Sequence, residues 1–390
     1  MQLVEVKSPS TAREFLRFNR WINRENPCYI SPMDNEVNDV FNPEKNTLFQ
    51  FGECCRWLLV DEKGNTCGRI AAFTNKKYKS RGTDVPVGGM GYFDCINDQE
   101  AANLLFRHAQ QWLESKGMKG MDGPINFGER DKWWGLLVEG FDKEPMYGMS
   151  FNPPYYQALF ENFGFKNYYN QYYYATYTRD PLPMRFAERH DRFAAKPEYT
   201  ARQIELNRLE KYAADFATIY NAAWAQHGEV KEITLEQVIK MFGKMKPIMD
   251  PRVIWFAYYK DEPIAMFVNI PDLNQYFKYF KGKLGWIEKF RLMLMKWRGT
   301  NKKLIGLVFG VIPKFQSLGI DSYLIYECAL VLKRNNWYDE YEMGWAGEWN
   351  PKMLNIYKSL GAQPSRRMVT FRYLFDATKP FERHPEMVYG

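Results

Sequence analysis

"LIGLVFGVIPKFQSLGIDSYLIYECALVLKR", residues 304–334, decides the fold of this chain. A run of strand character ends at Pro313, a short loop follows, and from Gly319 onward the apolar residues recur at helical spacing. The stretch therefore predicts a buried strand, a loop and a long amphipathic helix. Backbone N–H groups of the loop and first helical turn would point outward without partners, where the helix dipole adds positive potential. Such a corner attracts phosphate; Gln316 could donate a hydrogen bond to it, and Gly319 would allow close approach.

Two stretches with the same helix start and stop signals divide the chain into halves. Residues 152–165 (NPPYYQALFENFGF) and 350–362 (NPKMLNIYKSLGA) both begin with Asn-Pro, continue with helical spacing and close on a Gly. Asn is a good N-cap, Pro fits the first helical turn, and Gly supplies a left-handed C-terminal cap. In each half the predicted order is strand, helix, strand, helix, strand, which indicates a mixed α/β (α+β) fold that arose by internal duplication. The supporting segments are hairpins at 56–75 and 253–272, helices at 99–116 and 319–335, and strands at 121–127 and 338–347.

The length of 390 residues also favours two domains, because single cores rarely grow to that size. We expect a first domain over residues 1–178 and a second over residues 200–378. Residues 179–199 are charged, proline-punctuated and poor in aliphatic side chains, and are interpreted as a linker. Residues 379–390 are expected to form a C-terminal tail.

Composition narrows the class of protein. With 46% hydrophobic and 25% charged residues and no long apolar run, the chain is expected to be soluble, and without a signal-like start it is expected to be cytoplasmic. The net charge is only +7, because the 53 basic residues are mixed with 46 acidic ones. Nucleic-acid binding is therefore not indicated. The six cysteines and four histidines show no CxxC, HxxxH or HExxH spacing, so no metal site is expected.

The second half resembles the GNAT superfamily of acyl-CoA-dependent N-acyltransferases over about residues 200–375. The family's phosphate loop reads Arg or Gln, two residues, Gly, one residue, then Gly or Ala. Gln316 and Gly319 match this pattern, whereas Asp321 stands in the third place. A second family signature, an Asn that opens a helix carrying a Tyr before Gly-Ala, is matched by Asn350, Tyr357, Gly361 and Ala362.

The first half resembles the same family only through its second signature, at Asn152, Phe160, Gly164 and Phe165. Phe160 replaces the Tyr and lacks its hydroxyl. The corresponding loop region, residues 91–106, has neither the Arg or Gln nor the glycines, and its carboxylates would repel phosphate. The resemblance thus implies two GNAT-like domains, each a mostly antiparallel twisted sheet flanked by helices, of which the first is a degenerate copy that does not bind coenzyme A.

The resemblance also implies a chemistry: transfer of an acyl group from acetyl-CoA or another acyl-CoA to an amine of a small molecule or peptide. A backbone N–H near Val311 or Ile312 would hold the thioester carbonyl, and Tyr357 would protonate the departing thiolate. Among the glutamates near the relevant strand, Glu340, Glu342 and Glu348, we choose Glu348 as the base. The cofactor-binding residues implied are Val311, Ile312, Gln316, Ser317, Leu318, Gly319, Ile320, Asp321 and Asn350.

Asp321 leaves an alternative open, because its carboxylate would compete with a pyrophosphate or turn aside as a helix cap. In that case the chain would be a non-catalytic GNAT-like binding module whose aromatic cleft between the domains holds a peptide or lipid. A third possibility is that both domains jointly hold a bulky acceptor. Trp133 and Trp134 are interpreted as core or interface anchors rather than as a wall of an acceptor site.

Residues 282–299 form a further amphipathic pattern. A stripe of apolar residues is flanked by basic side chains, which suits either a helix on an anionic membrane or a helix packed on its own domain. We favour packing and keep contact of residues 282–299 with a membrane surface as the alternative. The stripe consists of Trp286, Phe290, Met293, Leu294 and Trp297, and the flanking residues are Lys289, Arg291, Lys296 and Arg298.

Overall fold

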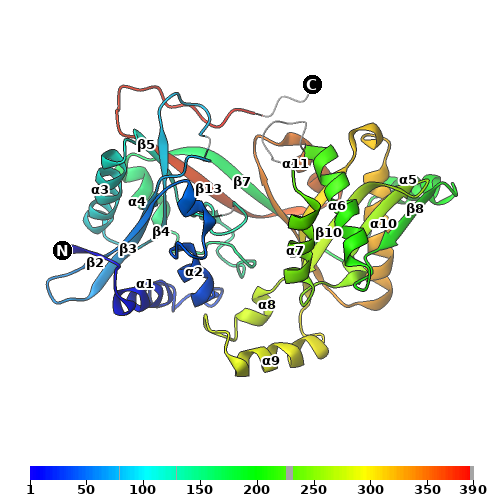
Figure 1. The fold of residues 1–390 in the computed structure, drawn as a ribbon, viewed down its shortest axis with the longest axis horizontal. Helices are drawn as coiled ribbons and strands as arrows, with labels where there is room; N and C mark the ends of the chain where they lie inside the picture. The colour runs from blue at the N-terminus through cyan, green and yellow to red at the C-terminus, as the bar shows by residue number, and fades with distance from the viewer. Residues whose placement is uncertain (79, 129, 225–231, 387–390) are drawn as a thin grey trace.

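A continuous β-sheet runs through both halves of the molecule, with helices packed against it (Figure 1). The computed structural model describes residues 1–78, 80–128, 130–224 and 232–386. The sheet has thirteen strands in this described part. They are β1 Gln2–Glu5, β2 Cys54–Val60, β3 Thr66–Phe73, β4 Val87–Cys95, β5 Gly120–Gly123, β6 Leu136–Glu139, β7 Lys166–Tyr177, β8 Tyr199–Gln203, β9 Ile254–Tyr259, β10 Glu262–Pro271, β11 Lys303–Val311, β12 Glu340–Gly347 and β13 Gln363–Leu374.

The order of strands across the sheet is β1-β2-β3-β4-β5-β13-β7-β12-β11-β10-β9-β8, with β6 paired to β13. Among the described strands, β4 with β5 and β11 with β12 are parallel, and the other pairs are antiparallel. The predicted mixed α/β fold with mostly antiparallel sheets is therefore confirmed. The helices that accompany the sheet are α1 Pro9–Ile22, α2 Asp34–Val40, α3 Gln99–Ser115, α4 Tyr156–Phe163, α5 Met184–Ala194, α6 Leu209–Trp224, α7 Leu235–Met245, α8 Asn274–Phe277, α9 Trp286–Trp297, α10 Ile320–Asn335 and α11 Pro351–Ser359.

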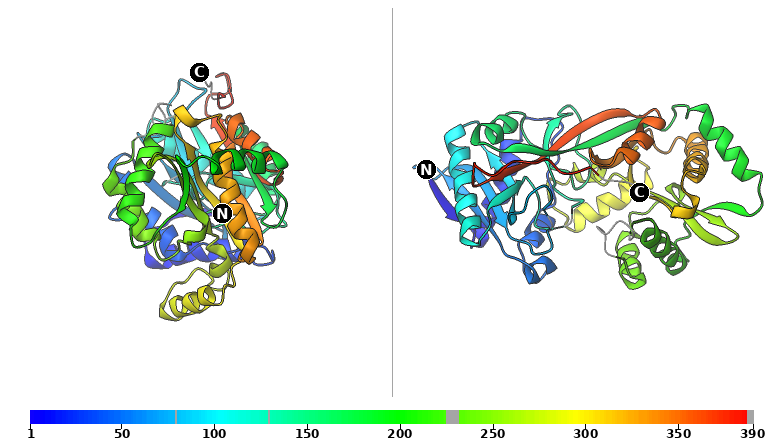
Figure 2. Two further views of the ribbon diagram at one scale, coloured as in Figure 1. Left: turned by 90° about the vertical axis from the view of Figure 1, so that its right-hand side faces the viewer. Right: turned by 90° about the horizontal axis from the view of Figure 1, so that it is seen from above.

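The two halves exchange their last strands. The first half runs β2, β3, β4, α3, β5, α4, β7, and the second repeats this order as β9, β10, β11, α10, β12, α11, β13. However, β7 pairs with β12 of the second half, and β13 pairs with β5 of the first half. The two exchanged strands also pair with each other along their length, and they lie side by side across the middle of the molecule (Figure 2). Each half thus has its sheet completed by the other.

The helices bury apolar stripes against this sheet. In the first half, α3 and α4 pack on a core that includes Phe106 and Phe160. In the second half, α10 packs on one face, while α6 and α7 cover the other. The segment expected to be a linker contains α5, whose Phe186 and Phe193 are buried against α10. That segment is therefore part of the second core.

The helix starts at the two Asn-Pro pairs differ. Asn350 caps α11, and its side chain accepts a hydrogen bond from the Met353 N–H at 3.1 Å, as predicted. The prediction that Asn152 opens a helix is wrong, because α4 begins at Tyr156. The Asn152 side chain instead bonds both the N–H and the carbonyl of Leu137, at 2.9 and 3.1 Å. It satisfies the main chain of β6, so it is not available as a cap.

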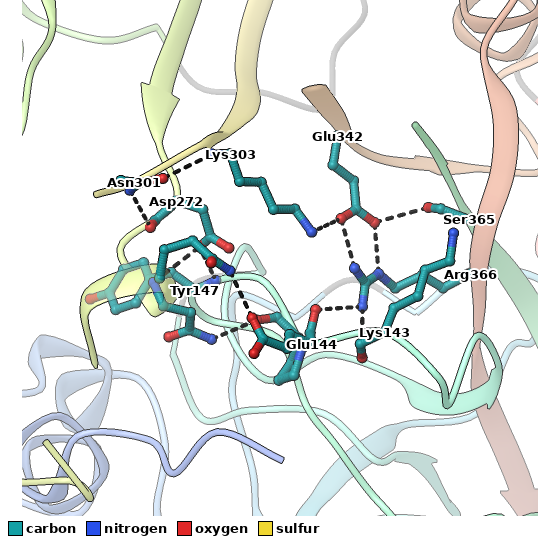
Figure 3. A network of polar contacts seen from close by, with 12 residues as sticks. Lys143, Glu144, Tyr147, Asp272, Asn301, Lys303, Glu342, Ser365 and Arg366 are labelled. Atoms are coloured by element: carbon teal, nitrogen blue, oxygen red, sulfur yellow. Dashed lines mark hydrogen bonds and ion pairs between the residues drawn. The ribbon is translucent and has the colours of Figure 1, made fainter. Parts of the chain in front are cut away.

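A buried polar network joins the halves (Figure 3). The Arg366 guanidinium of β13 donates two hydrogen bonds to Glu342 of β12, both at 2.7 Å, and a third to the carbonyl of Glu144 at 2.8 Å. Lys303 forms an ion pair with the same Glu342 carboxylate at 2.5 Å. Tyr147 of the first half donates its backbone N–H to Asp272 of the second at 3.0 Å. Glu342 is thus paired with two cations, as burial requires, whereas the Asp272 carboxylate accepts backbone N–H groups of Tyr147 and Asn274 and has its pKa raised by burial.

Helix α9 does not pack as expected. Its predicted apolar stripe faces solvent: Trp286 is 86% exposed, Phe290 70% and Trp297 82%. The packing contact is made by Leu292 and Met295 on the opposite side, which touch the cluster around α8. The prediction of packing through the aromatic stripe is therefore wrong, because a second, smaller apolar stripe makes the contact. In Figure 1, α9 projects from the body of the molecule.

All six cysteines are described and are free thiols. None of the helices in the described residues combines the length and the apolar character needed to cross a membrane.

Candidate active site

The strands β11 and β12 separate to form a wedge in the second half. They pair in parallel from Lys303 with Glu340 to Gly306 with Met343, and beyond these residues their pairing ends. From there β11 follows β10 and β12 follows β7, so one edge of each strand is left open. Two glycines form the apex: a Cβ on Gly344 would lie 2.8 Å from the Gly306 carbonyl oxygen. The close approach of the main chains at this point requires glycine.

The open edge of β11 carries a free backbone donor. Ile312 donates its N–H to the Ile264 carbonyl at 2.9 Å, toward β10. Because donors alternate sides along an antiparallel strand, Val311, which lies opposite Ala265, directs its N–H and carbonyl into the wedge. The Val311 carbonyl accepts a hydrogen bond from Gln316 Nε2 at 3.0 Å. Of the two residues expected to hold a thioester carbonyl, Val311 alone has an N–H on the wedge side.

The loop after β11 delivers the N-terminus of α10 to the mouth of the wedge. Ser317 and Gly319 have positive φ angles of 62° and 101°, and Gly319 is the N-cap residue, so no side chain caps the helix. The suggestion that Asp321 caps the helix is therefore wrong, although Asp321 does lie in the first turn. The backbone donors of that turn keep their capacity for an anion.

Arg189 of α5 adds a positive charge at this corner. A Cβ on Gly319 would lie 3.2 Å from Arg189 Cδ, and Arg189 Nη1 donates to Ser322 Oγ at 3.3 Å in the first turn of α10. Arg189 is not among the residues predicted for the site, because it lies in the segment interpreted as a linker. The predicted loop has Gln316 where the family pattern allows an arginine. Arg189 of α5 supplies a positive charge at the same corner.

Tyr357 lies on α11 with its hydroxyl at the apex of the wedge. The hydroxyl donates to the carbonyl of Gly344 at 2.7 Å. Burial raises the pKa of Tyr357 well above its usual value, so the side chain stays protonated at neutral pH. A protonated, buried hydroxyl beside the wedge is the form that a proton donor requires.

The glutamates near β12 have separate partners. Glu348 accepts hydrogen bonds from the N–H and the side-chain amide of Asn170, at 3.1 and 2.8 Å, and forms an ion pair with Arg383. These contacts direct it toward β7. Glu342 is held in the buried network: burial alone would raise its pKa, but Arg366 and Lys303 outweigh that effect and lower the pKa to about 2. Glu342 is therefore an anionic structural residue.

The first half contains the same wedge in a closed form. Ile96 donates its N–H to Cys67 at 2.9 Å, so Cys95 holds the place that Val311 holds in the second half. There the Cys95 N–H donates to the Tyr156 hydroxyl at 3.0 Å, and the Cys95 carbonyl accepts from the Tyr155 hydroxyl at 2.7 Å. Both polar groups of the open edge are thus taken by the chain itself.

The helix corner of the first half is closed as well. Asp98 is the N-cap of α3, and its carboxylate accepts the N–H groups of Glu100 and Ala101 at 2.8 and 3.2 Å. An anion could reach these donors only by displacing a carboxylate. The N-terminus of α10 in the second half has no such side-chain cap.

An apolar cavity lies beside the wedge, between the sheet and α10. The cavity is lined by Leu304 of β11 and by Tyr341 and Met343 of β12. Met343 belongs to the last pair before the strands separate, and Leu304 and Tyr341 pair with each other just before that point. The opposite wall comes from α10 and from the segment after β7. The further lining residues include Phe267, Ile325, Cys328, Leu332, Leu360, Pro181 and Leu182.

The two tryptophans singled out in the first half have different places. Trp134 is 7% exposed and donates its indole N–H to the Tyr169 hydroxyl at 2.7 Å, as an anchor would. Trp133 lines a separate cavity, whose polar wall contains the ion pair of Arg69 with Asp94, 2.6 Å long. No group of three or more His, Cys, Asp or Glu side chains that could hold a metal is present among the residues the structure describes.

No family model matches the sequence. The chain is 27% identical over 372 residues to a bacterial ceramide synthase of Caulobacter vibrioides, covering 93% of this chain and 94% of that protein, and 25% identical over 362 residues to protein YghO of Escherichia coli, covering 91% and 90%. Among solved structures, a tandem GNAT protein from the clavulanic acid biosynthesis pathway aligns with a TM-score of 0.54 at 11% identity, over 97% of this chain and 99% of that one. The fold is that of a tandem GNAT protein.

Proposed function

We propose that this tandem GNAT protein transfers an acyl group from an acyl-CoA to the amine of a lipid-type acceptor, and that its second half holds the acyl-CoA. The observation that carries the proposal is the open wedge between β11 and β12, which combines a backbone donor at Val311 with the uncapped N-terminus of α10 and Arg189. The first half has the same framework with each of these groups occupied. Acyl transfer therefore belongs to the second half.

The residues of the wedge can each perform one part of acyl transfer. Acyl-CoA supplies an acyl group activated as a thioester and a pyrophosphate as an anionic handle. Val311 polarises the thioester carbonyl through its N–H. The first turn of α10 and Arg189 bind the pyrophosphate, and the missing Cβ of Gly319 lets the Arg189 side chain lie against this corner. Tyr357 gives its proton to the thiolate as the carbon–sulfur bond breaks and the amide bond forms.

The acceptor amine must lose a proton during the reaction, and Glu348 is the proposed base. Its oxygens are bound by Asn170 and Arg383, so it accepts a proton only after the Arg383 ion pair opens. Glu348→Gln removes the basic oxygen but keeps the size of the side chain. Turnover equal to that of the wild type in this variant would exclude Glu348 as the base.

Two observations support a long acyl chain and a lipid-type amine. The cavity beside the wedge has apolar walls next to the apex, where an alkyl chain would gain stability by leaving water. A full-length relative is a bacterial ceramide synthase. We therefore propose a long-chain acyl-CoA rather than acetyl-CoA as the preferred donor.

Calorimetric titration with acetyl-CoA, longer acyl-CoAs, coenzyme A and pantetheine tests the proposal. We expect affinity to rise with chain length and Arg189→Ala to weaken coenzyme A binding by about ten-fold, the loss of roughly one charge-assisted hydrogen bond. Pantetheine lacks the pyrophosphate, so its affinity should not change. Arg192→Ala, an exposed arginine on the same helix, is the matched control.

Either of two results would overturn the proposal. Equal weakening in both arginine variants would remove Arg189 from the phosphate site. No binding of any acyl-CoA by the wild type would favour a non-catalytic binding module with the same fold.

A further inference from the structure

Helix α9 is an addition to the second half. It lies in residues 272–302, which connect β10 to β11, whereas the corresponding strands of the first half are joined by the shorter segment 74–86. No residue of α9 is buried. The helix projects away from the sheet (Figures 1 and 2), and it contributes nothing to the wedge. The helix is therefore a surface element of the second half.

The outer side of α9 is apolar along its whole length. Five large hydrophobic side chains of the helix are 69% to 86% exposed, including a tryptophan at each end. Four of them follow helical spacing on one line, with Ile287 beside the first. Leu292 and Met295 anchor the opposite side to the cluster around α8. The exposed residues are Trp286, Ile287, Phe290, Met293 and Trp297.

Basic side chains border this apolar line. Lys289 Nζ lies 5.2 Å from the ring centre of Trp286, and Arg291 lies 5.3 Å from that of Tyr279, which is itself 48% exposed. Glu288 is the acidic residue of the helix, and its carboxylate is used to accept the Gly285 N–H at 2.9 Å. The other basic residues around the helix are Lys281, Lys283, Lys296 and Arg298, of which Lys296 is hydrogen-bonded to the Pro247 carbonyl.

We propose that α9 docks the protein on the surface of an anionic phospholipid bilayer. A helix that lies in the interface presents aromatic and aliphatic side chains to the acyl region and basic side chains to the headgroups, with tryptophans at the boundary. The apolar line and basic border of α9 have this arrangement. The inference does not depend on the proposed acyl transfer.

Charge decides between a bilayer and a second copy of the chain. A symmetric contact would place the same surface of both copies together and bring their basic borders against each other, which opposes association. Lysine is also depleted at protein interfaces, and the apolar side chains of α9 project outward instead of lining a groove. An anionic bilayer satisfies both the charge and the shape.

Vesicle flotation of the full-length protein tests this inference. We expect the wild type to float with vesicles of phosphatidylcholine mixed with phosphatidylglycerol, and to bind vesicles of phosphatidylcholine alone far more weakly. A triple variant with Trp286→Ser, Phe290→Ser and Trp297→Ser should lose flotation. Neutralising Lys283, Lys289 and Arg291 with Gln should lower partitioning by about 100-fold, since each basic residue near the surface contributes several-fold.

The controls separate docking from folding and from self-association. Met184→Ser removes an equally exposed side chain, 75% exposed, from another helix and should float like the wild type. All variants should keep the thermal stability of the wild type, because the substituted side chains are exposed. A wild type that stays with the unbound fraction, or a triple variant of Trp286, Phe290 and Trp297 that floats normally, would overturn the inference. The inference would also be overturned if light scattering showed a wild-type dimer that becomes monomeric in the triple serine variant, because a second copy of the chain would then be the occupant.

Discussion

At the residue scale, one pair of positions separates the two copies of the fold. Cys95 and Val311 occupy the same place on equivalent strands, and each directs its main-chain groups toward its wedge. Two tyrosine hydroxyls take those groups in the first half. Neither the sequence of Tyr155-Tyr156 nor its spacing indicates this contact, because both tyrosines fit an ordinary helix core.

Residues at the site were predicted to different degrees. Gly319 begins α10 and Asn350 caps α11 as the sequence pattern predicts, because loop glycines and helix caps are determined by local conformation. Gln316, predicted to donate to a phosphate, donates to the Val311 carbonyl. Arg189 could not be predicted, since its approach to Gly319 depends on how α5 packs on α10. The pattern likewise could not choose between Val311 and Ile312, because that choice depends on the register with β10.

We expect Tyr357→Phe to lower kcat by about 100-fold or more, because a positioned proton donor typically contributes that much. Stability should fall by only about 1 kcal/mol, the usual value of one hydrogen bond, here the bond to Gly344. Steady-state kinetics and thermal unfolding measure the two effects. Tyr212→Phe removes a hydroxyl bonded to Gln203 in the same half and should leave kcat unchanged. Turnover retained in Tyr357→Phe would exclude the proton-donor role.

At the element scale, the exchange of β7 and β13 is the feature that sequence reasoning could not supply. The predicted hairpins, helices and strands of both halves are present, because hydrophobic periodicity is a local signal. Both closing strands, however, are long and rich in residues that suit a strand, so either could complete either half. Their partners are determined by tertiary packing. The domain boundary expected near residue 178 therefore divides the chain into two halves, but it does not divide the sheet, because β7 pairs with β12 and β13 pairs with β5.

A buried ion pair secures the exchanged strand. Arg372 of β13 donates to Asp122 of β5 at 2.7 and 2.8 Å, and both side chains are fully buried. We expect Arg372→Met to lower the free energy of unfolding by about 3–5 kcal/mol, because it leaves a buried carboxylate without its partner. Adding Asp122→Leu should restore part of the loss. Chemical denaturation measures both changes.

The matched control for Arg372 lies on the same strand. Arg367 pairs with Glu139, whose side chain is 61% exposed, so Arg367→Met should cost only about 1 kcal/mol. Equal losses in the Arg367 and Arg372 variants would show that the strand, and not the buried charge pair, determines the effect.

At the scale of the whole molecule, the halves are joined by charge as well as by strands. The carboxylate of Glu342 bonds to Arg366 and Lys303, and Arg366 continues to the carbonyls of Lys143 and Glu144 in the first half (Figure 3). The pKa of the Glu342 carboxyl group is lowered from 4.5 to about 2. The protonation of this one group is therefore coupled to the folding of both halves.

This coupling predicts a specific response to acid. Because the folded-state pKa is depressed, the stabilisation is present above about pH 4.5 and is lost as the pH falls toward 2. The shift corresponds to about 3 kcal/mol. We expect the difference in unfolding free energy between wild type and Glu342→Gln to shrink over that range in urea denaturation. A difference that stays constant with pH would contradict the depressed pKa.

The exchange of strands also has a consequence for how the protein is made. The place between β5 and β7 in the sheet is filled by residues 363–374, which are synthesised long after both of those strands. At typical rates of translation the first half waits about 10 to 40 s after its own residues have been synthesised. During that interval the edge of β5 and the tyrosine-rich β7 are exposed without their final partner. The order of synthesis thus leaves an unpaired sheet edge, a surface prone to aggregation, in the nascent chain until β13 has been synthesised.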